Sequence, residues 1–247
     1  MNFKIVKCLI GLGLLLLAAA HNCPAAGEVR FHDGVAAYEA GQYDTAAQAF
    51  RDSLAKQPAS GTLLDLGLAE WHRGRVGEAI LSWEQSAWLD PFTRDTRNNL
   101  LFAREAAEVN PPELTWFERA STWLPANFWT WIAGGSLWLA VAMVTLPGIF
   151  RVRKAGWHQT LAALAFGIFL LSLPPSVGII TRSNIGIILE KNTPLRLTPT
   201  REAETVDSLP AGEPARKLRE RGDFIFVHTQ NGSGWVERGQ IGFVCRE

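Results

Sequence analysis

The side chains best suited to catalysis are few in this chain and are not grouped. His32, His72, His158 and His228 lie far apart and form no HExxH pattern, and the three cysteines have no paired spacing. No GxSxG motif, phosphate-binding loop or GxGxxG motif occurs at a strand-to-helix junction. The sequence therefore predicts no catalytic residue, no metal site and no cofactor. The sequence instead indicates a binding function, in which aromatic and charged side chains contact a partner.

The densest charge cluster in an apolar setting is a group of three cations. Arg151, Arg153 and Lys154 occur within four residues, and residues 120–150 and 155–181 on either side contain no Asp, Glu, Lys or Arg. A membrane-spanning helix needs about 20 predominantly apolar residues. The cations therefore mark the connection between two apolar segments that are each long enough to span a bilayer.

These two segments predict a transmembrane hairpin with helices over 127–150 and 157–180 and a basic loop over 151–156. Pro174 and Pro175 are expected to kink or end the second helix. Short loops rich in Lys and Arg stay cytoplasmic, so the three cations are expected to determine the topology. Both flanking soluble parts should then lie on the opposite side of the membrane.

The first 26 residues have the pattern of a secretory signal peptide. Two lysines precede an apolar run at 8–20, and small residues follow it at a cleavage site expected after Ala26. Removal of this segment would leave Cys245 as the one cysteine, without an internal disulfide partner. Lipidation of Cys23 remains an alternative. A cleaved signal independently predicts that the following domain is exported.

An internal repeat follows the signal segment, with residues 37–58 matching residues 70–91 at an offset of 33. The matched pairs are Gly41 and Gly74, Ala46 and Ala79, Phe50 and Trp83, Ser53 and Ser86, and Pro58 and Pro91. This pattern resembles the tetratricopeptide repeat, a pair of antiparallel helices called A and B. The resemblance implies an all-α array over 27–109, with glycine in each turn, alanine between the helices and proline after helix B.

In each repeat the aromatic residue of helix B is expected to fill the gap to the neighbouring repeat. A third helix at about 93–109 is expected to cap the array, because two repeats alone leave an apolar face uncovered.

Arrays of this family bind peptides on the face formed by their A helices, and the resemblance implies eight partner-binding residues here. They are Phe31, Val35, Tyr38, Leu64, Leu68, Trp71, Asn98 and Phe102. The alternative is that several of them only pack one repeat against the next. The array carries 8 Lys or Arg against 13 Asp or Glu over residues 27–108, which argues against nucleic acid or anionic lipid as its ligand.

Residues 110–126 form a linker between the array and the first apolar segment. Pro111 and Pro112 are expected to end the last helix. The aromatic residues of 114–124 fall on one helical face, which predicts a short helix lying at the membrane interface. A buried connector is the alternative.

The last part, residues 183–247, has short runs with strand character separated by turn signals. Six strands in this length predict a small closed or nearly closed β barrel. The order of residues resembles the bacterial SH3-like domain. The matching positions are Pro194, Leu195, Arg196, Pro199, Leu209, Gly212, Gly222, Asp223, Val227, Gly234, Trp235 and Val236.

Two features of this domain allow more than one interpretation. Trp235 is expected in the barrel core, with a ligand platform as the alternative. Four cations between Arg216 and Arg221 predict a charged edge strand, which discourages aggregation, with contact to anionic headgroups or an acidic partner as the alternative.

The order of the modules resembles the Bat aerotolerance-operon proteins of the BatE type. The resemblance implies a non-enzymatic scaffold of the bacterial inner membrane, with both soluble domains in the periplasm. It also implies partners that carry von Willebrand factor A-type domains, and no nucleic acid. The alternative function is a cell-envelope sensor whose SH3-like domain binds peptidoglycan peptide.

Overall fold

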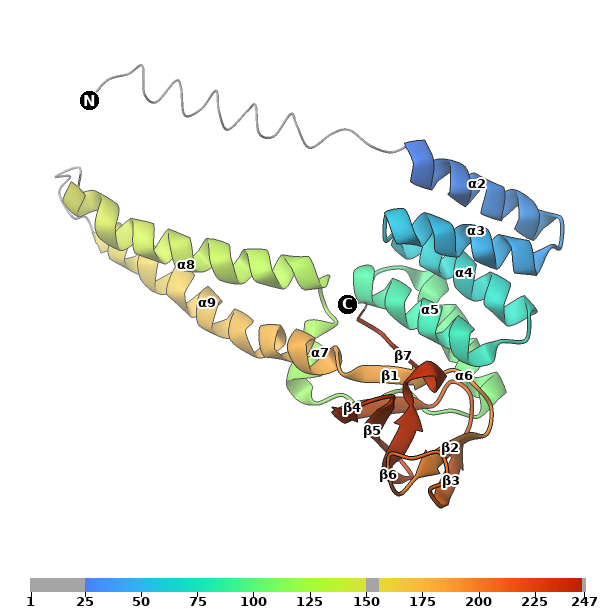
Figure 1. Ribbon diagram of the computed structural model, residues 1–247. Helices are drawn as coiled ribbons and strands as arrows, with labels where there is room; N and C mark the ends of the chain where they lie inside the picture. The colour runs from blue at the N-terminus through green and yellow to red at the C-terminus, as the bar shows by residue number, and fades with distance from the viewer. Residues whose placement is uncertain (1–24, 150–155, 246–247) are drawn as a thin grey trace.

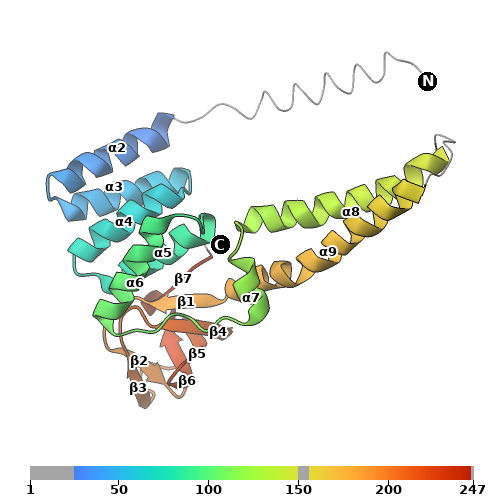
Figure 2. The same cartoon turned by 180° about the vertical axis from the view of Figure 1, so that it is seen from behind.

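The protein is described by a computed structural model that covers residues 25–149 and 156–245. Figures 1 and 2 show a helical array, a pair of long helices that projects away from it, and a sheet that lies beside the array. The expected signal segment, except for its last two residues, lies outside the described residues. So do Arg151, Arg153 and Lys154 of the expected basic loop.

The array contains five helices, as the repeat pattern predicts. They are α2 (Ala25–Glu39), α3 (Tyr43–Lys56), α4 (Ser60–His72), α5 (Val76–Leu89) and α6 (Arg94–Ala107). The turns α2–α3 and α4–α5 contain Gly41 and Gly74, both with a φ of +75°, a conformation that side chains rarely adopt. Helices α3 and α5 end just before Pro58 and Pro91.

The paired positions of the two repeats have matching roles in the core. Ala46 and Ala79 are fully buried. Phe50 packs against Gly34 of its own helix A and clusters with apolar residues of α4. Trp83 packs in the same way against Gly67, and its Nε1 donates a hydrogen bond to the carbonyl oxygen of Leu64 at 3.1 Å. The aromatic side chains therefore fill space within a repeat as well as between repeats.

The two apolar segments form α8 (Ala126–Ile149) and α9 (Gly156–Arg182), which lie side by side in both views (Figures 1 and 2). By length and composition both helices are able to cross a membrane. Helix α9 continues past Pro174 and Pro175, so of the two expected outcomes, a kink or an end, the helix end is wrong. Ser172 and Ser176 next to the prolines donate hydroxyl hydrogen bonds to carbonyls of the same helix, each at 2.7 Å. Hydroxyl groups of this kind help a helix to tolerate proline.

The C-terminal part is one antiparallel sheet of seven strands. They are β1 (Ile185–Ile188), β2 (Thr193–Arg196), β3 (Thr205–Leu209), β4 (Pro214–Arg221), β5 (Phe224–Thr229), β6 (Gly232–Glu237) and β7 (Ile241–Phe243). Their order is β3-β2-β6-β5-β4-β1-β7. Among the described residues no ladder joins β3 to β7, so the sheet is open and a closed barrel is not confirmed.

Three expectations for this sheet are corrected. Strand β3 was not predicted, because its sequence TVDSL is polar and four of its five residues are exposed. Strand β4 with its cations lies between β1 and β5, so the prediction of an edge strand is wrong. Trp235 is half-buried rather than in the core, because its ring lies on the outer side of the sheet beside Phe226, with centroids 5.2 Å apart.

The sheet packs on α5, and the two parts share one core. Ile80 and Trp83 of α5 cluster with Ile185 and Ile187 of β1. Gly77 lies so close to the backbone of Ile188 that a Cβ atom would not fit. The sheet therefore covers helix B of the second repeat and also packs against α6, where Leu100 and Ala103 share the core with Ile185. Helix α2 lies at the end of the array away from the sheet (Figure 1).

Candidate functional site

The eight residues expected to bind a partner lie on the three A helices, and we call the surface that they form the A-helix face. Asn98 and Phe102 of α6 are exposed, and Phe102 has 59% of its surface accessible. The other six are half-buried. An apolar side chain that remains accessible is available to a partner, whereas a fully buried one is not.

Aromatic rings join α4 to α6 on this face. Trp71 lies edge-on to Phe102 with the ring centroids 5.4 Å apart, and Trp71 is also 6.1 Å from the buried Trp83. Trp83 in turn is only 1% exposed. The accessible pair of Trp71 and Phe102 therefore packs on the core of the second repeat through Trp83.

The α2 part of the face is more involved in packing. Phe31 lies 5.9 Å from the buried ring of Phe50, and Phe31, Val35 and Tyr38 all pack against the core of the first repeat. Tyr38 reaches His72 at the end of α4, with centroids 5.7 Å apart, and partial burial raises the pKa of its hydroxyl. The structure thus connects Tyr38 to α4, whereas Phe31 and Val35 mainly support the fold.

An ion network on the other side of the two repeats joins α3, α4 and α5. The carboxylate of Glu70, 1% exposed, accepts hydrogen bonds from Arg51 and from Arg73, the latter at 2.7 Å. Arg51 also reaches Glu78 at 2.9 Å. Burial raises the pKa of Glu70, while Arg51 opposes that shift. The network therefore links helix B of the first repeat to both helices of the second.

The linker contains the short helix α7 (Trp116–Ser121). The segment has features of both alternatives, the helix at a membrane interface and the buried connector. Trp116 and Trp123 at its ends are about 70% exposed, as an interfacial helix would require. Glu118 is buried and pairs with Arg216 of β4 at 2.7 Å, as a connector would require. Residues 114–124 therefore join the apolar helices to the sheet while two tryptophans remain accessible.

We call the contact between α7, the end of α9 and β4 the joint, and sequence reasoning missed it. Burial acts to raise the pKa of Glu118, but hydrogen bonds from Arg216 and from the backbone N–H of Thr115 lower it to about 2. Arg182 donates to the Ser121 hydroxyl at 3.0 Å and lies 4.7 Å from the ring centre of Trp88 in α5. The capping-box spacing of Thr115 and Glu118 was the one sequence signal for this structure.

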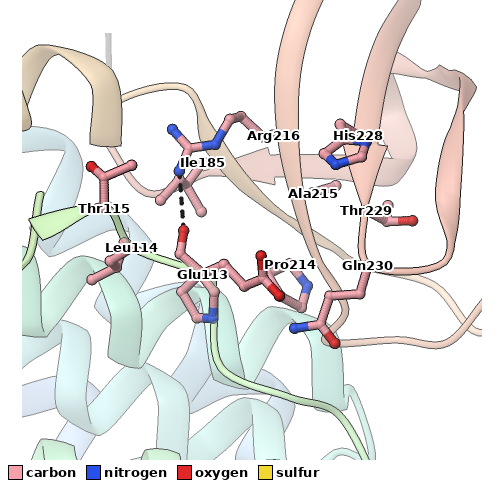
Figure 3. Close-up of a pocket in the computed structure, with 11 residues that line it drawn as sticks. Glu113, Leu114, Thr115, Ile185, Pro214, Ala215, Arg216, His228, Thr229 and Gln230 are labelled. Atoms are coloured by element: carbon pink, nitrogen blue, oxygen red, sulfur yellow. Dashed lines mark hydrogen bonds between the residues drawn. The ribbon is translucent and has the colours of Figure 1, made fainter.

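A cavity of about 330 Å³ lies beside the joint, between the linker and strands β4 and β5 (Figure 3). Arg216 crosses one end of it and donates to the carbonyl oxygen of Glu113 at 3.2 Å. His228 and Gln230 lie toward the other end (Figure 3). The Arg216 guanidinium is already paired, and residues 25–149 and 156–245 contain no cluster of metal-ligating side chains.

Comparison with known proteins agrees with the repeat pattern. The tetratricopeptide repeat family model matches residues 14–61 and 33–91, which is less than half of the chain. No curated protein matches the chain. The tetratricopeptide repeat is a non-catalytic repeat for protein–protein interaction, so the matched region indicates protein partners. The A-helix face lies partly within it.

Proposed function

We propose that the protein is a non-enzymatic adaptor that binds a segment of a partner protein on its A-helix face. One observation carries this proposal: Trp71 and Phe102 form an accessible aromatic pair on a supported surface, while the sheet covers helix B of the second repeat. Large aromatic side chains on a rigid base are typical centres of protein interfaces. An apolar or aromatic residue of the partner would pack against the accessible sides of Trp71 and Phe102.

We further propose that α8 and α9 anchor the adaptor as a transmembrane hairpin in a bacterial inner membrane. Their accessible surface is rich in large apolar side chains, such as Trp138 and Leu171, each more than 70% exposed. With Arg151, Arg153 and Lys154 in the cytoplasm, the array and the sheet would both face the periplasm. The exposed tryptophans beside α7 would then lie at the level of the headgroups.

The sheet is proposed to be an SH3-like domain, and the module order supports a protein of the BatE type. Membrane partners with von Willebrand factor A-type domains are the partners that this resemblance favours. The shared core between α5 and the sheet supports a spacer role for the sheet, since it holds the array at a fixed place relative to the joint.

The test is crosslinking in cells of the full chain, followed by identification of the captured protein. Trp71→Ala and Asn98→Ala should each reduce capture several-fold, because they remove contacts at the centre of the proposed interface. Phe92→Ala is the matched control, since Phe92 is 60% exposed but lies between α5 and α6 rather than on an A helix. Capture that is unchanged in the two variants would contradict the proposal.

A second function, the sensing of cell-wall peptides, is favoured by one observation. Trp235 and Phe226 form a half-buried aromatic pair on the outer side of the sheet, where a ligand is able to reach them. Pull-down of the full-length protein with purified sacculi tests this function, because the sheet shares its core with the array. Retention that is lost in Trp235→Ala would support the sensor, and no retention would exclude it.

A further inference from the structure

A second cavity, of about 430 Å³, lies where the array meets the joint, and we call it the arginine cavity. Three arginines from distant parts of the sequence line it: Arg97 and Arg104 from α6, and Arg182 from the end of α9. One carboxylate, that of Glu84, lines it as well. The cavity thus has a surplus of positive charge.

Ion pairs within the protein account for only one of the three cations. Arg104 pairs with Glu84, and burial lowers the pKa of its guanidinium to about 10, so it stays protonated at neutral pH. Arg97 and Arg182 have no ion pair among the described residues. Arg182 is held in place by Trp88 and Ser121, whereas Arg97 is exposed. Arg97 therefore faces the cavity without an ion pair among the described residues, and Arg182 shares the nearby carboxylate of Glu118 with Arg216.

The remaining wall of the arginine cavity is largely apolar and leads toward the long helices. Leu100, Leu114 and Ile185 contribute to this wall. Beside it lies a separate, very small cavity of about 10 Å³, which also touches Arg182, Ala126 at the start of α8 and Ile179 in α9. A ligand with an anionic end and an apolar remainder would match this arrangement.

We propose that the arginine cavity binds the phosphate group of an anionic ligand. A guanidinium binds phosphate oxygens through two parallel hydrogen bonds, which is the reason why arginine is common at phosphate sites. Arg182 is the last residue of α9, a proposed membrane helix, and this place favours an anionic phospholipid headgroup as the source over a free phosphate. The phosphate site itself is independent of the proposed adaptor function, and only this choice of source rests on the proposed membrane anchor.

The net negative charge of the array argues against such a ligand only at long range. At physiological ionic strength charges are screened beyond about 8 Å, so the groups that line the cavity dominate at contact distance. Across the cavity wall the balance is three arginines to one glutamate. The local charge is therefore opposite in sign to that of the array as a whole.

The test uses the full chain purified in a neutral detergent, with binding measured by native mass spectrometry. The probes are phosphatidylglycerol, the zwitterionic phosphatidylcholine and inorganic phosphate, each titrated separately. We expect phosphatidylglycerol to bind more tightly than phosphatidylcholine. Arg97→Ala should weaken binding about tenfold, because it removes one charge-assisted contact. Arg94→Ala is the matched control, since Arg94 is exposed on the same helix but does not line the cavity.

Each outcome decides the proposal. Phosphatidylglycerol binding that is weakened by Arg97→Ala and not by Arg94→Ala supports the site with a lipid source. Binding of inorganic phosphate alone, with the same response to the two variants, supports the site with a soluble source. Equal binding by wild type and both variants, with equal thermal unfolding curves, overturns the proposal. No partner protein is present, so this result would leave the adaptor function untouched.

Discussion

The two repeats have the same backbone design, yet their B helices have different surroundings. Helix α3 of the first repeat exposes polar residues to solvent, whereas α5 of the second is covered by β1 and β7. The internal offset of 33 residues allows the two helices to be compared position by position. The comparison shows which changes turn a solvent-exposed helix into an interface helix.

Three pairs of positions illustrate the change. Gln48 of α3 is exposed, and its counterpart Leu81 packs against Gly242 of β7. The second pair is Asp52 and Gln85, one turn further along each helix. Asp52 accepts a hydrogen bond from the side-chain amide of Gln48 in the same helix, whereas Gln85 donates to the carbonyl oxygen of Phe243 in β7 at 2.9 Å.

The third pair is Ala55 and Trp88. Ala55 is exposed, whereas the ring of Trp88 makes a cation–π contact with the guanidinium of Arg182 at the end of α9. The motif positions that define the repeat are therefore common to both copies, while the outer positions of the second copy connect the array to the sheet and to the apolar helices.

The largest expected effects come from truncating the buried aromatic residue of each repeat. They test whether the second repeat, unlike the first, also stabilises the sheet. Trp83→Ala and Phe50→Ala should each lower the free energy of unfolding by about 3–5 kcal/mol, the usual cost of truncating a buried aromatic side chain. Amide hydrogen exchange should show that Trp83→Ala also loosens β1, because Trp83 shares a core with Ile185 and Ile187. Equal exchange of β1 in the two variants would contradict the shared core.

The joint contacts the second repeat through Trp88, and it should make the stability of the protein depend on pH in the acid range. Glu118→Gln breaks a buried ion pair and should cost about 3 kcal/mol at neutral pH. The folded-state pKa of about 2 lies below the usual value of 4.5. The stability that Glu118 contributes is therefore present above pH 4.5 and is lost as the pH falls toward 2. Denaturant unfolding at several pH values should show that the wild type and the variant converge in acid.

A conservative substitution should have opposite effects at two helical glycines. Gly77→Ala places a Cβ against the backbone of Ile188 and should cost about 1–3 kcal/mol through overpacking. Gly61→Ala in α4 meets no atom within 4 Å and should stabilise by up to about 1 kcal/mol, since alanine favours helix. Thermal unfolding measures both. Similar midpoints for the two variants would argue against close packing of α5 on the sheet.

The helical part was predictable because its signals are local. The glycines at 41 and 74 and the prolines at 58 and 91 mark turns and helix ends within one repeat, and the five helices follow the expected pattern. The two long helices were predictable from composition for the same reason. Of the candidate site, the accessible pair Trp71 and Phe102 followed from the repeat pattern.

The contacts between distant segments were not predictable from the sequence. Glu118 and Arg216 are 98 residues apart, and nothing near either residue indicates the other. Strand β3 carries no hydrophobic alternation, so only its pairing with β2 identifies it. Trp235 was expected in the core because of the resemblance to the SH3-like domain. In β6, however, Gly234 and Val236 are buried and Trp235 between them is half-buried, as the alternation of a strand requires.

The most direct test of the adaptor function compares the A-helix face with the exposed B helix of the first repeat. A photocrosslinking residue is placed at Phe102 in one variant and at Gln48 in the other, both of which are exposed positions. In cells, the residue at position 102 should capture one defined protein, and Trp71→Ala should reduce the capture several-fold. The residue at position 48 should capture no such protein. Equal capture from both positions, or capture from position 102 that is unaffected by Trp71→Ala, would contradict the assignment of the A-helix face as the partner site.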